Sequence, residues 1–194
     1  LEGWLIVLRR RMMKENLNNE NEDWDIVWDY SMGLPEDNGF TKTIDGANIS
    51  DELTDNGLLI SVNSGGYIRY KPIGFETCNE GIYEIKFIMS TIPANNGIRL
   101  ILSNGTDGNQ IFINSNQIKY DQRGVQIKID NVIFDTESTI KIERINNQNY
   151  VYVNNEIIYQ SEIVSNWYTS GNYLFFQTNP LKAVLKSIKF KRIS

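Results

Sequence analysis

The sequence contains no histidine and only one cysteine among its 194 residues. Histidine is the commonest general base, proton shuttle and metal ligand of proteins, so its absence excludes His-dependent nucleophilic triads and many metal centres. A single cysteine, Cys78, cannot form a disulfide within the chain, which suits a protein made in a reducing compartment. We expect Cys78 to be a small buried apolar residue beside a loop.

The sequence also lacks a basic surplus and any long apolar run. Its net charge is −5 and its pI is near 4.9, whereas nucleic-acid-binding proteins usually carry a basic footprint, so we expect no nucleic-acid partner. No run of about 20 apolar residues is present, which predicts no membrane span. In residues 3–13 the arginines follow the apolar residues, the reverse of a secretory signal peptide, so we expect synthesis in the cytoplasm without a signal peptide.

Residues 1–23 are predicted to form a short helix and a polar linker. Over residues 4–15 apolar side chains recur at helical spacing, and such a stripe must be buried against something. The helix either docks on the domain that follows or serves for attachment and oligomerisation; the residues for the second role are Trp4, Leu5, Leu8 and Met12. Residues 16–23 have no apolar periodicity and are typical of a linker.

Residues 24–194 are predicted to form one all-β domain. Segments with a two-residue apolar repeat alternate with turns rich in Asn and Gly. The longest segment is Gly81 to Met89, in which Tyr83, Ile85, Phe87 and Met89 share one face. The predicted strands cover residues 58–62, 67–70, 81–89, 98–102, 110–113, 117–120, 125–129, 139–144, 150–153, 156–159, 173–178 and 183–191. Many short, closely spaced strands of this kind indicate an antiparallel sandwich or barrel.

Turns and large aromatic residues add two local expectations. Asn146 to Asn149 and the pair Asn154-Asn155 should form tight hairpin turns, because asparagine tolerates the left-handed backbone conformation. Trp24, Trp28 and Phe40 flank the first strand and should lie in the core, since large aromatic side chains dominate sandwich interiors.

The order and spacing of the strands resemble the concanavalin A-like lectin/glucanase superfamily in its laminin-G-like form. The matching segments are Gly81 to Phe87, Ile98 to Leu102, Thr139 to Arg144, Tyr150 to Glu156, Gly171 to Phe176 and Leu185 to Phe190. The resemblance covers residues 24–194, although Asn154-Asn155 stands where that family usually has Asn-Gly or Asp-Gly. It implies a two-sheet antiparallel jelly-roll sandwich and a role in carbohydrate binding.

A second resemblance concerns residues 24–40 and the arginine-rich segment before them. They look similar to the start of prophage tail or structural modules of Gram-positive bacteria. This resemblance implies a virion-associated location, with either a host-surface glycan or other virion and tail subunits as partners.

The sequence offers little for glycoside hydrolysis, which some members of the resembled superfamily perform. A retaining glycosidase needs two carboxyl groups about 5 Å apart, and the glucanases of the superfamily carry them in a Glu-x-Asp-x-x-Glu strand. Here the strand 81–89 carries only Glu84 and the strand 139–144 carries only Glu143. The acidic clusters at residues 20–25 and 35–37 should be solvated loop charges. We therefore expect no catalytic residues, with a divergent glycoside hydrolase as an alternative.

Aromatic, arginine and amide side chains on the polar side of strands are the candidate ligand-binding residues. Sugars stack on flat aromatic rings, and their hydroxyls pair with planar polar groups. The candidates are Arg69, Arg99, Gln110, Tyr120, Trp167, Tyr173 and Gln177. Trp167 lies in a loop, and the others should line one groove on one sheet. The alternative is that the tyrosines complete the core and the arginines are merely solvated.

Residues 104–109, Asn-Gly-Thr-Asp-Gly-Asn, are a candidate calcium loop. Oxygen donors come from Asn104, Asp107 and Asn109, and the laminin-G-like resemblance implies such a site at a loop end. Only one carboxylate is present, however, and a plain hairpin turn accounts for the same residues. No other cofactor is expected.

Three functions are consistent with these observations. The first is a non-catalytic carbohydrate- or cell-surface-binding module on a phage or prophage-derived particle, which predicts an exposed groove of aromatic and arginine side chains. The second is a purely structural virion or tail protein, which predicts an exposed apolar interface. The third is a divergent glycoside hydrolase, which predicts two facing carboxyl groups about 5–10 Å apart.

Overall fold

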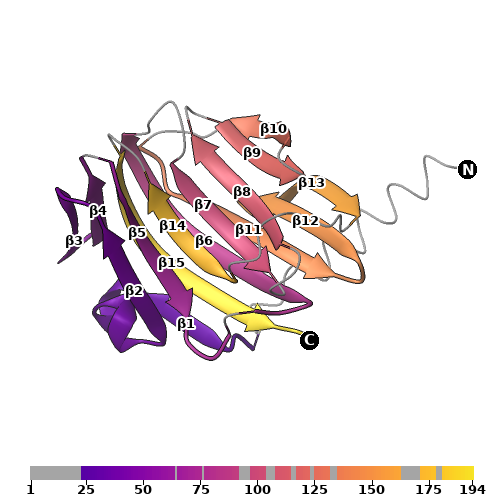
Figure 1. Ribbon diagram of the computed structural model, residues 1–194, viewed down its shortest axis with the longest axis horizontal. Helices are drawn as coiled ribbons and strands as arrows, with labels where there is room; N and C mark the ends of the chain where they lie inside the picture. Colours follow the sequence, from indigo (N-terminus) through magenta and orange to yellow (C-terminus); the bar gives the residue numbers. More distant parts are fainter. Residues whose placement is uncertain are drawn as a thin grey trace, which may run out of the picture.

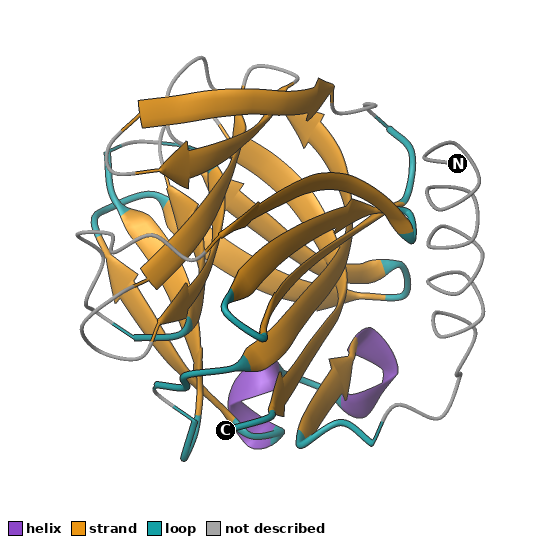
Figure 2. Cartoon of the chain, turned by 90° about the vertical axis from the view of Figure 1, so that its right-hand side faces the viewer, coloured by secondary structure: helices purple, strands orange, loops and turns teal. Residues whose placement is uncertain are grey.

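The described part of the chain is almost entirely β-structure. The computed structural model describes residues 23–63, 65–75, 77–91, 97–103, 108–114, 117–122, 125–131, 135–162, 171–177 and 181–194. These residues form 15 strands and two 3-10 turns, which confirms the all-β prediction (Figure 2). The expected helix at residues 4–15, with Trp4, Leu5, Leu8 and Met12, lies outside the described residues. In the described ranges, no helix is long and apolar enough to cross a membrane.

Sheet A contains eight antiparallel strands. Along the sheet their order is β13-β12-β11-β6-β15-β4-β3, and β1 pairs with β15 beyond the end of β4. The strands are β1 (Ile26–Asp29), β3 (Ile49–Thr54), β4 (Gly57–Val62), β6 (Gly81–Thr91), β11 (Ser138–Ile145), β12 (Gln148–Val153), β13 (Glu156–Glu162) and β15 (Leu181–Arg192). The long β15 is therefore central: β6 lies on one side of it, and β4 and β1 lie on the other.

Sheet B contains seven antiparallel strands in the order β10-β9-β8-β7-β14-β5-β2 (Figure 1). They are β2 (Phe40–Asp45), β5 (Tyr67–Pro72), β7 (Ile98–Ser103), β8 (Gly108–Asn114), β9 (Gln117–Gln122), β10 (Val125–Asn131) and β14 (Tyr173–Gln177). The 3-10 turns η1 (Tyr30–Met32) and η2 (Pro35–Asp37) connect β1 to β2. The late strand β14 lies between β5 and β7, so distant parts of the chain meet in this sheet.

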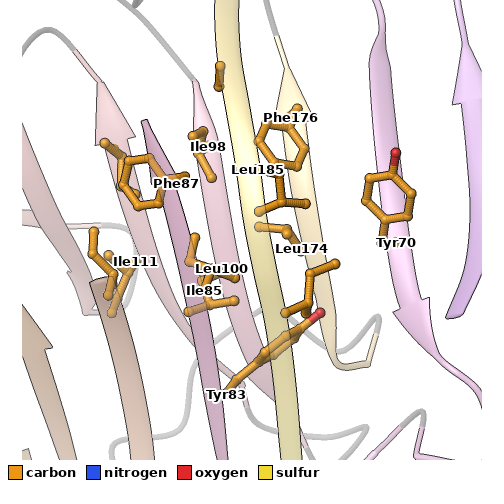
Figure 3. Packing of buried hydrophobic residues seen from close by; sticks show 14 of the residues in the cluster. Tyr70, Tyr83, Ile85, Phe87, Ile98, Leu100, Ile111, Leu174, Phe176 and Leu185 are labelled. Carbon is orange, nitrogen blue, oxygen red and sulfur yellow. The ribbon is translucent and has the colours of Figure 1, made fainter. Parts of the chain in front are cut away.

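The core lies between the two sheets. Tyr83, Ile85, Phe87 and Met89 share its sheet A side, as their two-residue spacing predicted, and none is more than 1% exposed. Residues of sheet B face them from the other side, among them Leu100, Leu174 and Phe176 (Figure 3). Burial of apolar surface, at about 25 cal/mol per Å², is the main stabilising contribution in such a sandwich.

Local expectations were mostly confirmed. Trp28 and Phe40 lie in the core, and Cys78 is buried, which raises the pKa of its thiol. The prediction for Trp24 was wrong: it lies half-buried outside the core cluster, with the Lys189 Nζ 5.3 Å from its ring centroid. That prediction rested on side-chain size, but Trp24 precedes β1 and no strand pairing turns its side chain inward.

The asparagine-rich turns have the predicted conformation. Asn146 and Asn147 have φ values of 51° and 59°, and Asn154 and Asn155 have φ values of 49° and 67°. These turns join β11 to β12 and β12 to β13. Asparagine is favoured at such positions because its side chain tolerates positive φ better than most.

A polar cluster joins the two sheets where their edge strands β2 and β3 face each other. The Lys42 Nζ of β2 lies 3.0 Å from the Asp51 Oδ2 of β3, and the Tyr70 hydroxyl donates to the same oxygen at 2.8 Å. Lys42 also forms an ion pair with Glu36. Burial lowers the pKa of Lys42, but its hydrogen bonds to Glu36 and Asp51 outweigh this and leave the pKa above its ordinary value.

Replacing Asp51 by Asn should lower the free energy of unfolding by about 1–3 kcal/mol, because Lys42 loses its buried anionic partner. Glu52 is the exposed next residue of β3, so Glu52→Gln removes the same charge as a matched control and should change stability by less than about 0.5 kcal/mol. Urea unfolding of both variants checks this; equal effects would contradict the role of the cluster.

Tyr83 should make the fold sensitive to alkali. Its side chain is fully buried, and burial raises the pKa of its hydroxyl from the ordinary value of 10.0. The unfolded state therefore loses this proton first, and stability decreases as the pH rises above 10. At pH 10.5 the contribution is about 0.8 kcal/mol, so Tyr83→Phe should reduce the stability lost between pH 8 and pH 10.5 by that amount. Denaturant titrations at the two pH values measure it, and an unchanged loss would refute the assignment.

Candidate functional site

One face of sheet B points away from the core, and we call it the outer face of sheet B. In β5, Ile68 and Tyr70 point inward and are fully buried, so strand alternation directs Arg69 outward. The same argument applies to the neighbouring strands. The outward side chains used below are Tyr67, Arg69, Lys71, Arg99, Gln110, Phe112, Asn114, Lys119, Asp121, Tyr173, Phe175 and Gln177. In the described ranges, no third layer of strands or α-helices covers this face.

Cations and aromatic rings alternate in one row across the outer face of sheet B. Arg69 pairs with Phe175, and Phe175 pairs on its other side with Arg99. Arg99 pairs in turn with Phe112, and Phe112 with Lys119. Because neighbouring strands are about 4.8 Å apart, each cation in this row lies next to at least one ring.

The two guanidinium groups of the row rest on aromatic rings. The guanidinium carbon of Arg99 lies 4.6 Å from the Phe112 centroid and 5.7 Å from that of Phe175. The same carbon of Arg69 lies 5.7 Å from the centroids of both Tyr67 and Tyr173. Tyr67 also stacks on Phe175, with centroids 4.6 Å apart. Cation–π contact, worth about 0.5–2 kcal/mol each, uses the flat side of a guanidinium and directs its in-plane donors elsewhere.

Several polar atoms on this face are buried without a hydrogen-bond partner among the described residues. They are the Nε of Arg69 and the amide oxygens of Gln110, Asn114 and Gln177. The Gln110 side chain is fully buried, and its Nε2 donates to Asp121 Oδ2 at 3.3 Å. A buried polar atom left without a partner costs about 1–3 kcal/mol, so four of them on one face favour a site that a polar ligand completes.

The structure brings most of the sequence-predicted ligand-binding residues together. Arg69, Arg99, Gln110, Tyr173 and Gln177 all lie on the outer face of sheet B. Tyr120 does not: it points into the core, 2% exposed, and its hydroxyl accepts from Asn149 Nδ2 at 3.1 Å. In β9 the inward positions are those of Ile118 and Tyr120, so alternation turns Lys119 outward instead. Trp167 lies outside the described residues.

Most of the candidate calcium loop lies outside the described residues. Asn104 and Asp107 lie outside the described residues, and the side chain of Asn109, in β8, does too. Among the side chains that the structure describes, no three His, Cys, Asp or Glu residues are grouped to hold a metal ion. Calcium binding stays a prediction from the sequence.

Sequence analysis missed three aromatic residues of the outer face. Tyr67, Phe112 and Phe175 were not among the candidates, yet they hold the two arginines in place. Each lies two residues from a candidate on the same strand, namely Arg69, Gln110 or Tyr173. The two-residue repeat could therefore have identified them.

Glu84 and Glu143, the acidic residues of the two strands considered for catalysis, lie on the outward side of sheet A. Glu84 Oε1 is 3.0 Å from Lys189 Nζ, and Glu143 Oε1 is 2.8 Å from Lys141 Nζ. The Tyr152 hydroxyl donates to Glu143 Oε2 at 2.6 Å. Both oxygens of Glu143 are thus engaged within the protein, which is typical of a structural ion-pair network.

A small hollow lies at one end of the sandwich, apart from the outer face of sheet B. Its volume is about 260 Å³, and its lining residues are Thr77, Cys78, Asn79, Arg192 and Ser194. None of these residues carries an aromatic ring on which a flat ligand could stack, so the outer face of sheet B remains the stronger candidate.

Comparisons with known proteins identify the fold. No protein-family model and no curated protein matches the sequence. Among solved structures, the chain is similar to the carbohydrate-binding module CBM66 from Bacillus subtilis, with a TM-score of 0.53 and 11% identity over 79% of this chain and 95% of that one. It is also similar to domain 4 of AbnA, a GH43 extracellular arabinanase from Geobacillus stearothermophilus solved with arabinotriose (TM-score 0.59, 11% identity, 87% and 92% covered).

A third similar structure is described in connection with endo-acting O-glycanases of the human gut microbiota. Its TM-score is 0.64 at 12% identity, and the match covers 89% of this chain and all of that one, 100%. At such low identities the three likenesses show a shared β-sandwich fold and nothing finer.

Replacing Lys141 by Met should destabilise the protein by about 2–4 kcal/mol, because Glu143 would be left as a buried carboxylate with one donor fewer. Lys86 is a suitable control, since it pairs with Glu137 on the same sheet but both side chains are more than 40% exposed. Lys86→Met should cost less than about 1 kcal/mol. Thermal unfolding compares the two, and a tolerated Lys141→Met would argue against a structural role for Glu143.

Proposed function

We propose that this protein is a non-catalytic binding module of the lectin-like jelly-roll type, which binds carbohydrate on the outer face of sheet B. The observation that carries this proposal is the row in which guanidinium groups and aromatic rings alternate beside buried amide oxygens that lack partners. A sugar presents C–H surfaces to a ring and hydroxyl groups to the amides, so one ligand class satisfies both features.

The fold comparisons support a carbohydrate ligand. CBM66 is named as a carbohydrate-binding module, and domain 4 of AbnA was solved with arabinotriose. Both share the sandwich architecture with this chain, although a shared fold alone does not fix a ligand. The chemistry of the outer face of sheet B points the same way independently.

The positions of the carboxylates on the outer face of sheet B support a non-catalytic role. In the described part of sheet B, the outward acidic side chains are those of Asp45 in β2 and Asp121 in β9. Five strand spacings separate these two strands, which is roughly 24 Å along the sheet. The two carboxyl groups of a glycosidase lie only about 5–10 Å apart, so this pair does not fit hydrolysis. A location on a phage or prophage particle stays a prediction from the sequence.

A glycan array followed by calorimetric titration of the best ligand tests the proposal. Tyr67 on the outer face of sheet B and Tyr150 on the outward side of sheet A are both half-buried tyrosines, which makes them matched positions. Tyr67→Ala should weaken binding about tenfold or more, because a ring that contacts Arg69 and Phe175 is lost. Tyr150→Ala should bind as the unchanged protein does.

Three results would count against the proposal. They are the absence of any glycan ligand, equal effects of the two tyrosine variants, and the release of new reducing ends from a bound polysaccharide. In the last case, loss of that release in Glu84→Gln or Glu143→Gln would favour the glycoside hydrolase alternative.

A further inference from the structure

The outer face of sheet B carries a positive surplus that the whole chain does not. Its described outward charges on β2, β5, β7, β8, β9 and β14 are Arg69, Lys71, Arg99, Lys119, Asp45 and Asp121. Four of these are cationic and two are acidic, whereas the chain has a net charge of −5. The local field therefore attracts anions to the face that the proposed function assigns to glycan, while the rest of the molecule repels them.

Three lysines on the outward side of sheet A pair with acidic side chains. Lys86, Lys141 and Lys189 each form an ion pair with a glutamate. On the outer face of sheet B, Arg69 and Arg99 lie over aromatic rings. The Nε of Arg69 is buried without a hydrogen-bond partner in the described ranges. A planar guanidinium offers paired N–H donors that match the two oxygens of a carboxylate.

The spacing of the two arginines fits a chain of sugars that runs across the strands. Arg69 and Arg99 are the neighbours of Phe175 on either side, so they lie two strand spacings apart, about 10 Å. In an extended glycan, the distance from one sugar to the next is similar to the distance between neighbouring strands. A sugar near Phe175 would thus place its two neighbours beside the two guanidinium groups.

Building on the proposed function, we infer that the outer face of sheet B recognises an acidic glycan, whose carboxylate groups are bound by Arg69 and Arg99. Phe175 lies beneath the sugar between them, and the amide of the partly exposed Gln177 pairs with a hydroxyl group. Lys71 and Lys119 add to the positive potential of the outer face of sheet B. They do not determine which sugar of the glycan lies at which strand.

A panel of paired ligands tests this inference with the complete chain. The acidic members are hyaluronan oligosaccharides and oligogalacturonate, and each has a counterpart whose carboxyl groups are reduced to alcohols. At least one acidic member should bind, and its reduced counterpart should bind about tenfold more weakly or worse, because hydrogen bonds to a charged group are lost. A heparin oligosaccharide measures general attraction to polyanions.

Charge-matched variants locate the binding. Arg69→Gln and Arg99→Gln should each weaken binding of the acidic ligand about tenfold or more. Lys182→Gln removes one positive charge from an exposed side chain of β15 in sheet A and should leave binding unchanged. Circular dichroism and thermal unfolding establish that each variant is folded.

The outcomes separate this inference from the proposed function. Equal binding of acidic and reduced ligands, still sensitive to Tyr67→Ala, would overturn the inference and keep carbohydrate binding. No binding to any member of the panel or the glycan array would overturn both. Preference for heparin, with equal losses in Arg69→Gln and Lys182→Gln, would show non-specific attraction to polyanions and would overturn the inference.

Discussion

The two-residue repeat of side chains along the strands of sheet B determines both the core and the candidate site. In β14, Leu174 and Phe176 enter the core, and the same alternation directs Tyr173, Phe175 and Gln177 to the outer face. A shift of one residue in the pairing of this strand would bury a glutamine and expose a phenylalanine. Selection for a packed interior therefore also keeps the outer face in register with Arg69 and Arg99.

Much of the fold could be predicted from the sequence, and the omissions have a physical reason. All twelve predicted strand segments lie within or overlap the observed strands, whereas β1, β2 and β3 have no predicted counterpart. β1 is a four-residue strand that pairs with β15. β2 and β3 are edge strands of sheets B and A, so they are less buried and carry polar residues such as Thr41 and Glu52 at the outward positions. A polar edge strand has little apolar periodicity. Its polar residues also discourage pairing with the strands of other chains.

The candidate site was predictable strand by strand but not as a surface. Periodicity shows which residues share a face, yet it does not show which face turns inward when both carry aromatic residues. Tyr120 illustrates this, because it packs on Tyr159 of β13, and that contact depends on how the sheets are stacked. The row from Arg69 to Lys119 depends on the strand order β5-β14-β7-β8-β9, which joins segments far apart in the sequence. The residue pattern of a single strand does not indicate the order of the strands in the sheet.

The central position of β15 has a consequence for biosynthesis. Residues 181–192 pair with β6, β4 and β1, and Ile188 lies opposite Trp28. A nascent chain that emerges from the ribosome therefore carries β1, β4 and β6 long before the strand they share, and closing such long loops is slow. Sheet A can be completed only after residue 192 has left the exit tunnel. Until then β1, β4 and β6 lack the strand they share, and open strand edges of this kind favour aggregation.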